Sequence, residues 1–277
     1  MGGYRRAGIV SSRYGLAVTD SLPPDQDTPA PGASLVFDRV ADIYDHTRGG
    51  MRRGRRVAAE LAPLLAHGPV LEVGVGTGLI ALGLRELGYP VVGVDLSAPM
   101  LARAYDRVGP CLARADAQAL PVRSASMGTV LFVHVLQLVG DLGATLAEAA
   151  RVLRPGGRLV AVYGGPLMEP DDLVETTEPL RALREGRPDA PAVVVPAAAA
   201  VGFRVVEQRL TAPYVVPTTP AELAASIADR QWSYLWRVDE ATWRAEVEPV
   251  IAALRALPDQ DRVRRQVGRT NLTVLAR

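Results

Sequence analysis

The stretch that decides the fold is Val70-Leu71-Glu72-Val73-Gly74-Val75-Gly76-Thr77-Gly78. An apolar run typical of a buried strand leads into three glycines at alternate positions, and an amphipathic helical pattern follows over 79–87. Glycine allows a sharp backbone turn and leaves no Cβ between the backbone and a ligand. The stretch therefore predicts a strand, a ligand-binding loop and a helix, with Glu72 at the end of the strand.

The main alternative for this loop is the dinucleotide fingerprint G-x-G-x-x-G, in which a helix N-terminus meets a pyrophosphate. Here position 79 is leucine, and the third glycine comes one residue early, at Gly78. The Glu72 carboxylate would also repel a pyrophosphate, whereas it suits a ligand that carries an amino group. The residues therefore favour such a ligand, and a nicotinamide oxidoreductase stays as the most distant alternative.

Two further carboxylates follow apolar runs. Asp95 ends the run over 91–94, 17 residues beyond Gly78, where an acid can bind the two hydroxyls of a ribose. It can instead cap the next helix, although Ser97 is available for that role. Asp116 follows the third run. Its carboxylate can accept a hydrogen bond from an adenine amino group while the next backbone N–H reaches a ring nitrogen, or it can simply close a turn.

Beyond the glycine loop, β-branched runs alternate with amphipathic helical patterns. Strands are expected at 70–73, 91–94, 111–115, 129–133 and 158–163, and helices at 79–87, at 99–107 and from Asp141 to a stop at Pro155-Gly156-Gly157. This alternation predicts an α/β fold with a doubly wound parallel sheet covered by helices on both faces. Such a sheet binds its ligand at the carboxyl ends of its strands, where the glycine loop and the two acids fall.

The two ends of the chain are less regular. Strands are expected over 203–206 and 272–275, and helices near 221–230 and 240–257. The long connection over about 210–268 predicts a lid or substrate insertion within the sheet. Residues 1–34 contain a proline-rich stretch and predict a flexible leader, so the folded domain is expected over 35–277.

Composition argues against several classes of protein. A net charge of +1 at pH 7 predicts neither a nucleic-acid binder nor a membrane-surface protein. The single cysteine, Cys111, and the absence of metal-like spacing among the three histidines predict no metal site. No apolar run reaches the roughly 18 residues of a membrane span, and no signal peptide is apparent. We expect a soluble cytoplasmic protein, monomeric or homodimeric, that acts on a small molecule.

These motifs, taken in series, resemble those of class I methyltransferases that depend on S-adenosylmethionine (SAM). The matching residues are Glu72-x-Gly74-x-Gly76-x-Gly78, Asp95 with Ser97, Asp116-Ala117, and Leu153-Arg154-Pro155-Gly156-Gly157. Phe37-Asp38 with Tyr44-Asp45 and Arg48 is similar to the short helix that precedes the core in the small-molecule branch. The resemblance implies a Rossmann-like seven-stranded sheet in the order 3-2-1-4-5-7-6, with the last strand antiparallel and with helical lid insertions. The chain departs from the family at Met127-Gly128-Thr129, where a Phe-Asp pair is common.

The resemblance also implies a cofactor site for SAM and for the product S-adenosylhomocysteine. The expected cofactor-binding residues are Glu72, Gly74, Val75, Gly76, Thr77, Gly78, Asp95, Leu96, Met100, Asp116, Ala117, Phe132, Val133 and Arg48. The ring of Tyr44 would lie near the sulfonium and the guanidinium of Arg48 near the ligand carboxylate. Ordinary helix packing and a solvated arginine are the alternatives for these two side chains.

The methyl group is expected to point toward the loop over 132–137. The protein must bring the nucleophile close, align it and exclude water. A base is needed only if the acceptor is a hydroxyl or amine that holds its proton at neutral pH. His134 is the candidate base, and the alternative is that it packs against the cofactor or bonds a backbone carbonyl.

An apolar or aromatic substrate is suggested by aromatic residues in the insertion. The expected substrate-binding residues are Trp232 and Trp236, together with Leu167 and Met168 after the fifth strand. The chain is therefore expected to move the SAM methyl group to an oxygen, nitrogen or carbon atom of a small metabolite. The alternative is a SAM-fold protein, such as a regulator or a cyclase, that binds the cofactor without methylating.

Overall fold

A computed structural model describes residues 10–11, 16–17, 45, 49–184, 187–236 and 238–277. The chain divides into two compact units. The first comprises Met1–Tyr163, Pro188–Arg209 and Leu272–Arg277, and the second comprises Gly164–Arg187 and Leu210–Asn271. Near the N-terminus, β1 (Val10–Ser11) and β2 (Leu16–Ala17) form an antiparallel pair.

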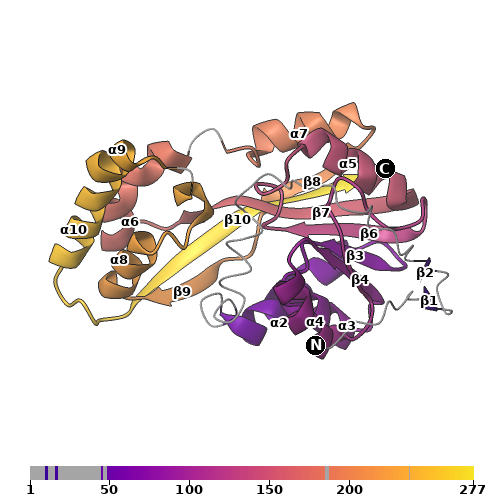
Figure 1. Ribbon diagram of the computed structural model, residues 1–277, viewed down its shortest axis with the longest axis horizontal. Helices are drawn as coiled ribbons and strands as arrows, with labels where there is room; N and C mark the ends of the chain where they lie inside the picture. The colour runs from indigo at the N-terminus through magenta and orange to yellow at the C-terminus, as the bar shows by residue number, and fades with distance from the viewer. Residues whose placement is uncertain (1–9, 12–15, 18–44, 46–48, 185–186, 237) are drawn as a thin grey trace, which may run out of the picture. The chain divides into compact units, whose positions relative to one another are not determined.

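The first unit is built on a sheet with the strand order β5-β4-β3-β6-β7-β10-β8 (Figure 1). The strands are β3 (Val70–Val73), β4 (Val91–Asp95), β5 (Leu112–Arg114), β6 (Met127–Val133), β7 (Leu153–Met168), β8 (Arg204–Leu210) and β10 (Arg264–Ala276). Parallel ladders join β3 to β4 and β6, β4 to β5, and β6 to β7. The predicted order 3-2-1-4-5-7-6 is confirmed, with β10 as the closing strand.

The closing strand β10 is antiparallel to β7, as predicted. The Tyr163 hydroxyl lies 2.7 Å from the Thr273 Oγ1, and the Glu169 N–H donates to the Val267 carbonyl at 2.8 Å. Residue numbers therefore rise along one strand as they fall along the other. The predicted count of seven strands is wrong, because an eighth strand, β9 (Tyr214–Thr218), pairs antiparallel with β10.

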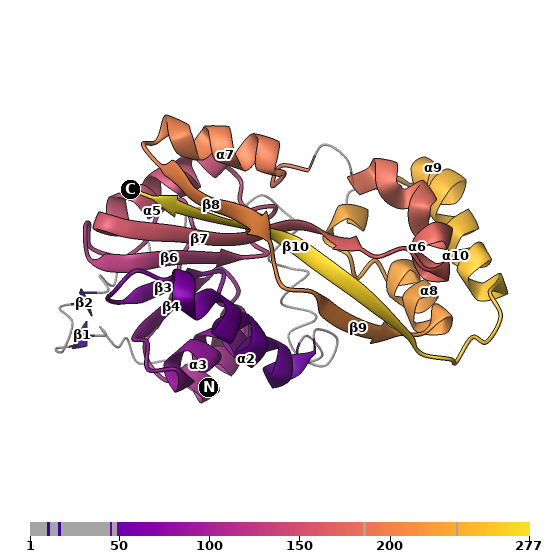
Figure 2. The same ribbon diagram turned by 180° about the vertical axis from the view of Figure 1, so that it is seen from behind.

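Helices cover both faces of the sheet in the first unit. Figures 1 and 2 show α5 (Leu142–Val152) and α7 (Pro191–Ala200) on one face, and α2 (Gly50–Leu61), α3 (Leu79–Glu86) and α4 (Ala98–Val108) on the other. Each face has its own apolar cluster, and alternate residues of β6 serve the two clusters: Phe132 faces α5 and α7, whereas Leu131 faces the opposite cluster. This two-sided burial explains why the strands of a parallel sheet have continuous apolar sequences.

Several strands are longer than the sequence predicts, and β7, β8 and β10 differ most. β7 begins at Leu153 rather than after the Pro155-Gly156-Gly157 stop, and a register shift against β6 between Met127 and Thr129 accommodates these residues. β8 continues to Leu210, and β10 begins at Arg264 rather than at 272. The extension of β10 depends on its pairing with β9, a long-range partner that local sequence patterns do not reveal.

The second unit contains short helices and the β9–β10 pair. Its helical elements are α6 (Asp172–Thr177), a 3₁₀ segment (Glu178–Arg184), α8 (Pro220–Ala228), a 3₁₀ turn (Ser233–Leu235), α9 (Glu240–Thr242), a π-helical turn (Trp243–Val247) and α10 (Glu248–Ala256). Their apolar faces form one cluster that includes Leu173, Ile227, Trp243 and Leu254. A role as a substrate module stays a prediction.

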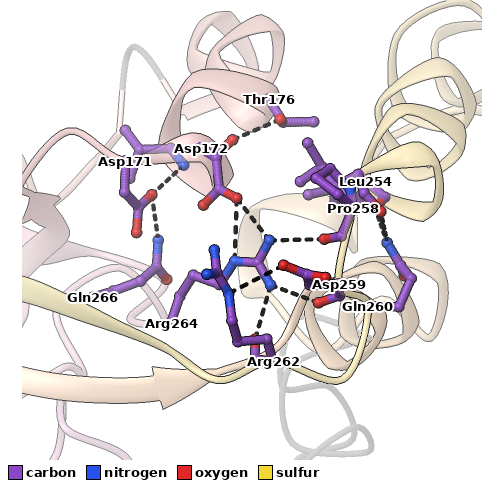
Figure 3. Close-up of polar contacts among 12 residues, drawn as sticks. Asp171, Asp172, Thr176, Leu254, Pro258, Asp259, Gln260, Arg262, Arg264 and Gln266 are labelled. Atoms are coloured by element: carbon purple, nitrogen blue, oxygen red, sulfur yellow. Dashed lines mark hydrogen bonds and ion pairs between the residues drawn. The ribbon is translucent and has the colours of Figure 1, made fainter.

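A buried arginine organises the loop before β10 (Figure 3). The Arg264 guanidinium donates to Asp172 Oδ2 at 2.8 and 3.1 Å and to the carbonyls of Pro258, Asp259 and Arg262 at 2.7–2.9 Å. Its side chain is only 7% exposed, whereas that of Asp172 is 39% exposed. Arg264 also holds the pKa of Asp172 below its usual value. One cation therefore ties α6 to the loop after α10.

We predict that Arg264→Met lowers the free energy of unfolding of the second unit by about 2–3 kcal/mol, less than the loss for a fully buried pair because Asp172 is partly exposed. Since Arg264 depresses the Asp172 pKa, the deficit should be full at neutral pH and shrink as the pH falls through that lowered value. Tryptophan fluorescence during urea unfolding reports this unit selectively, because all three tryptophans lie in it.

Arg262→Met is the matched control, since that side chain is 68% exposed and should contribute about 0.5 kcal/mol or less. Equal losses in the two variants would refute the proposed importance of Arg264.

Candidate functional site

The glycine loop between β3 and α3 forms the centre of the site. Gly74 and Gly76 have φ angles of +72° and +54°, which L side chains rarely adopt. A Cβ at Gly74 would lie 2.1 Å from Val135 Cγ2, so only glycine lets the loop after β6 approach this closely. A Cβ at Gly76 would meet nothing within 4 Å. The loop is therefore packed against its neighbour at Gly74 and open to a ligand at Gly76.

Asp95, at the end of β4, holds the glycine loop in place. Its Oδ2 accepts from the Gly76 N–H at 2.7 Å, and its Oδ1 accepts from the Ser97 N–H at 2.9 Å. Ser97 caps α4 by accepting from the Met100 N–H, which is the role that the sequence left to it. A carboxylate offers about four acceptor positions, so these two bonds are compatible with the predicted contact to ribose hydroxyls.

Glu72 is the most perturbed titratable group that the structure describes. The residue is 2% exposed, and its Oε2 has no hydrogen-bond partner among the described residues. Burial raises the pKa of Glu72 to about 8, the neighbouring Asp95 adds to the increase, and the Ala81 N–H partly offsets it. A buried acceptor without a donor is costly, and a ligand ammonium group would satisfy it. The site thus fits the amino group that the sequence predicted.

One pocket brings together many of the predicted residues. It is lined by Glu72, Gly74, Val75, Gly76, Thr77, Val133 and His134, together with Arg53, Gly54, Leu79 and Ile80. Its volume of about 50 Å³ has room for a small polar group, so a whole nucleoside would extend beyond it. The pocket therefore fits the amino-acid end of a SAM-like ligand.

Arg53 is a pocket residue that the sequence analysis missed. It reaches the pocket because α2 packs very closely on α3: a Cβ at Gly54 would lie 2.5 Å from the Leu79 carbonyl, and one at Gly83 would lie 2.8 Å from the Ala58 Cβ. Four arginines flank Gly54 in the sequence, so the pattern alone does not show which of them faces the site. The sequence feature that could have indicated this close packing is the pair of glycines at the helix contact, Gly54 and Gly83.

Asp45 and Arg107 were also missed. The Thr77 hydroxyl donates to Asp45 Oδ1 at 2.5 Å, and Arg107 forms an ion pair with the same carboxylate and donates to the Thr77 carbonyl at 2.5 Å. The Thr77 hydroxyl therefore binds Asp45, and a contact of Thr77 with the cofactor stays a prediction. Asp45 belongs to the motif that resembles the short helix before the core, and the Asp45 side chain itself binds the glycine loop through Thr77.

The residues predicted to contact adenine make ordinary turn and core contacts, unlike Glu72 and Asp95. Asp116 accepts from the Gln118 N–H at 2.8 Å and from its side-chain amide at 3.2 Å, so it does close a turn. The Leu96 carbonyl accepts from the Arg114 Nε at 2.9 Å. Phe132 and Met100 are 0% and 2% exposed, so their side chains belong to the interior and any ligand contact would come from the backbone. Contacts of Asp116, Ala117 and Leu96 with adenine stay predictions.

His134 terminates β6 in a strained conformation. Its φ of +56° lies in the left-handed region, at a cost of about 1–2 kcal/mol for a residue with a side chain. Its N–H donates to the Val162 carbonyl at 2.8 Å, and its carbonyl accepts from the Gln137 Nε2 at 2.8 Å. Strained residues of this kind are concentrated at functional sites. The structure places His134 in the wall of the pocket beside the glycine loop, and its role as a base stays a prediction.

The remaining predicted residues are not brought to this pocket by the described contacts. Tyr44 and Arg48 lie outside the described residues. Leu167, 55% exposed, and Met168 belong to the second unit, as do Trp232 and Trp236. The indole N–H groups of these tryptophans donate to Ser226 Oγ and to the Arg230 carbonyl, respectively. Their contacts with a substrate stay predictions.

Parts of this chain are similar in sequence to known proteins. Residues 71–161 match the family model described as a methyltransferase domain. The chain is 35% identical over 136 residues to demethylmenaquinone methyltransferase of Tropheryma whipplei. The matched region covers 45% of this chain and 56% of that protein. The chain is also 37% identical over 147 residues to the ubiquinone/menaquinone biosynthesis C-methyltransferase UbiE of Desulfotalea psychrophila. This match covers 49% of this chain and 59% of that protein. The chain thus spans little more than half the length of these relatives.

A solved structure extends the likeness to most of the chain. The [4+2]-cyclase SpnF superposes with a TM-score of 0.54 at 17% identity, covering 88% of this chain and 94% of that one. This likeness shows a common fold. None of the helices that the structure describes is long and apolar enough to cross a membrane.

The raised pKa of Glu72 leads to a prediction about proton release. At pH 7 the buried carboxyl is mostly protonated, and an ammonium group placed against it favours the carboxylate, so binding of S-adenosylhomocysteine should release about one proton. Affinity should rise between pH 6 and pH 8 by up to roughly tenfold per pH unit. Calorimetry in buffers of different ionisation enthalpy measures the release. Glu72→Gln should abolish it, and a wild-type protein that binds without proton release would contradict the assignment.

Asp95→Ala should weaken binding of S-adenosylhomocysteine by about 2–4 kcal/mol, because the predicted ribose contacts and the anchor of the Gly76 N–H would be lost together. Asp141→Ala is the matched control. Asp141 caps α5 through the Ala144 N–H at 3.0 Å, so its loss should cost about 1 kcal/mol of stability and leave affinity unchanged. Titration calorimetry and thermal unfolding separate the two effects, and unchanged affinity in Asp95→Ala would show that the ribose lies elsewhere.

Proposed function

We propose that the protein binds SAM at the glycine loop and methylates a small apolar or aromatic molecule, because residues 71–161 match the model of a methyltransferase domain and the sheet has the strand order that the resemblance implies. The observation that carries the proposal is the buried Glu72 carboxyl group, whose Oε2 has no hydrogen-bond partner among the described residues, beside the open Gly76 position. When bound, SAM supplies a methyl group already activated by its sulfonium.

The residues of the pocket have complementary roles in this proposal. Glu72 receives the ligand ammonium group, and Arg53, a cation in the same pocket, pairs with the ligand carboxylate. Asp95 binds the ribose while it fixes the glycine loop. Val133 and His134 close the pocket at the reacting end, where they limit access of water. His134 would act as a base only for an acceptor that holds its proton.

The acceptor we propose to test first is a quinone-type aromatic ring, methylated on carbon. The support is the similarity to the demethylmenaquinone methyltransferase and to the C-methyltransferase of ubiquinone and menaquinone biosynthesis. Trp232, Trp236, Leu167 and Met168 belong to the second unit, and their contact with such a ring stays a prediction. The similarity covers only part of those proteins, and an oxygen or nitrogen acceptor remains the alternative within this class.

A second candidate is a protein that binds SAM without transferring its methyl group. The fold that this chain shares with the [4+2]-cyclase SpnF supports this non-methylating alternative, because one fold can carry out more than one chemistry.

The experiment is to incubate the protein with methyl-labelled SAM and either aromatic quinone precursors or fractionated extract. We expect label in a small-molecule fraction, with turnover reduced at least tenfold in Asp95→Ala at a SAM concentration below its Kd. Label in protein or nucleic acid would overturn the substrate class. Tight binding of S-adenosylhomocysteine with no transfer to any fraction would favour the non-methylating alternative.

A further inference from the structure

The turn after β6 contains a glutamine whose side chain has an unusual environment. Gln137 Nε2 donates to the His134 carbonyl at 2.8 Å. Its Oε1 is buried and has no hydrogen-bond partner among the described residues. The amide orientation follows from chemistry, since the reverse orientation would place two oxygens against each other. Among the described residues, this amide therefore bonds the backbone of the strained residue that follows β6 and no other group.

The bond from Gln137 stabilises the unfavourable backbone conformation of His134. A left-handed φ of +56° is unfavourable for histidine, and two hydrogen bonds fix it: the His134 N–H to the Val162 carbonyl and the His134 carbonyl to Gln137. The first belongs to the β6–β7 ladder and would exist with many side chains at position 137. The second requires a donor at that position, which glutamine supplies and an apolar residue does not.

The orientation of this turn also matters for the glycine loop. Val135 follows His134 directly, and its Cγ2 occupies the space that a side chain at Gly74 would need. A change in the orientation of the His134 carbonyl would rotate the peptide unit between His134 and Val135. The Val135 side chain would then shift relative to the glycine loop. The same turn ends with the Leu138 N–H donating to the Val135 carbonyl at 2.8 Å.

From this geometry we infer that Gln137 is a positioning residue for methyl transfer: its amide holds the His134 backbone and thereby sets how the end of β6 meets the glycine loop. The inference about transfer rests on the proposed function, whereas the inference about His134 geometry does not. Gln137 acts through the His134 backbone, so it is distinct from the candidate base itself.

The structural part can be tested without substrate. Protein labelled with ¹⁵N and ¹³C only at histidine gives three backbone signals, from His46, His67 and His134. In Gln137→Met we expect the His134 signal alone to shift, together with a change in its coupling constant that reports φ. Gln137→Glu should resemble the wild type at low pH, where the protonated carboxyl can donate, and resemble Gln137→Met at high pH.

Gln260→Met is the matched control, because Gln260 Nε2 also donates to backbone carbonyls, those of Leu254 and Leu257 at 2.9 and 2.8 Å, within the second unit. It should leave the His134 signal unchanged. An unshifted His134 signal in Gln137→Met, or equal behaviour of the Met and Glu variants at every pH, would overturn the inference. An unchanged His67 signal shows that the variants are folded.

The catalytic part uses the transfer assay. Gln137→Met should lower kcat about tenfold, as expected for the loss of one well-placed hydrogen bond, and should change the SAM KM less than about twofold. Gln137→Glu should recover activity as the pH falls. A Gln137→Met variant with a shifted His134 signal and full kcat would refute the role in transfer. Absence of transfer in the wild-type protein would instead refute the proposed function.

Discussion

The hydrogen bond from the Gly76 N–H to the Asp95 carboxylate is the interaction on which the site depends. It joins the loop after β3 to the end of β4, two neighbouring strands of a parallel sheet whose carboxyl ends meet at one edge. Because the same carboxylate accepts from Ser97 at the start of α4, the glycine loop, the strand end and the next helix share one anchor. Without it, the Gly76 N–H would lose the acceptor that orients the loop backbone toward the strand ends.

The electrostatic character of the pocket follows from this arrangement. Two carboxylates lie at the ends of adjacent strands, and the deeper of them, Glu72, is withdrawn from water. Burial and the charge of Asp95 both disfavour a second negative charge, which raises the pKa of Glu72. A ligand with a positive charge resolves the conflict, whereas a phosphate would aggravate it. The same two residues therefore favour a ligand that carries a positive charge over one that carries phosphates.

Around this anchor, contacts without a local sequence signature complete the site. Val135 packs where a Gly74 side chain would be, and Arg107 and Thr77 share Asp45. Gln137 supports the strained His134 backbone. The contacts of Val135, Asp45 and Arg107 join the glycine loop to other elements, and the Gln137 bond lies within the turn that packs on the loop, so the loop is held on several sides. The open side, at Gly76, is the side that a cofactor would use.

The sequence by itself determined the class of fold, the strand order through its family resemblance, and the residues of the glycine loop with Asp95 and Ser97. It did so because these depend on local periodicity, on glycines that cannot be replaced, and on acids at strand ends. Only the tertiary structure decided that Arg53 reaches the pocket, that Thr77 binds Asp45 and that Phe132 faces the core. It also revealed β9, whose partner β10 lies about 50 residues further along the chain. These features depend on which helix face or strand edge meets a distant partner, and a sequence pattern specifies the face of an element without naming the partner.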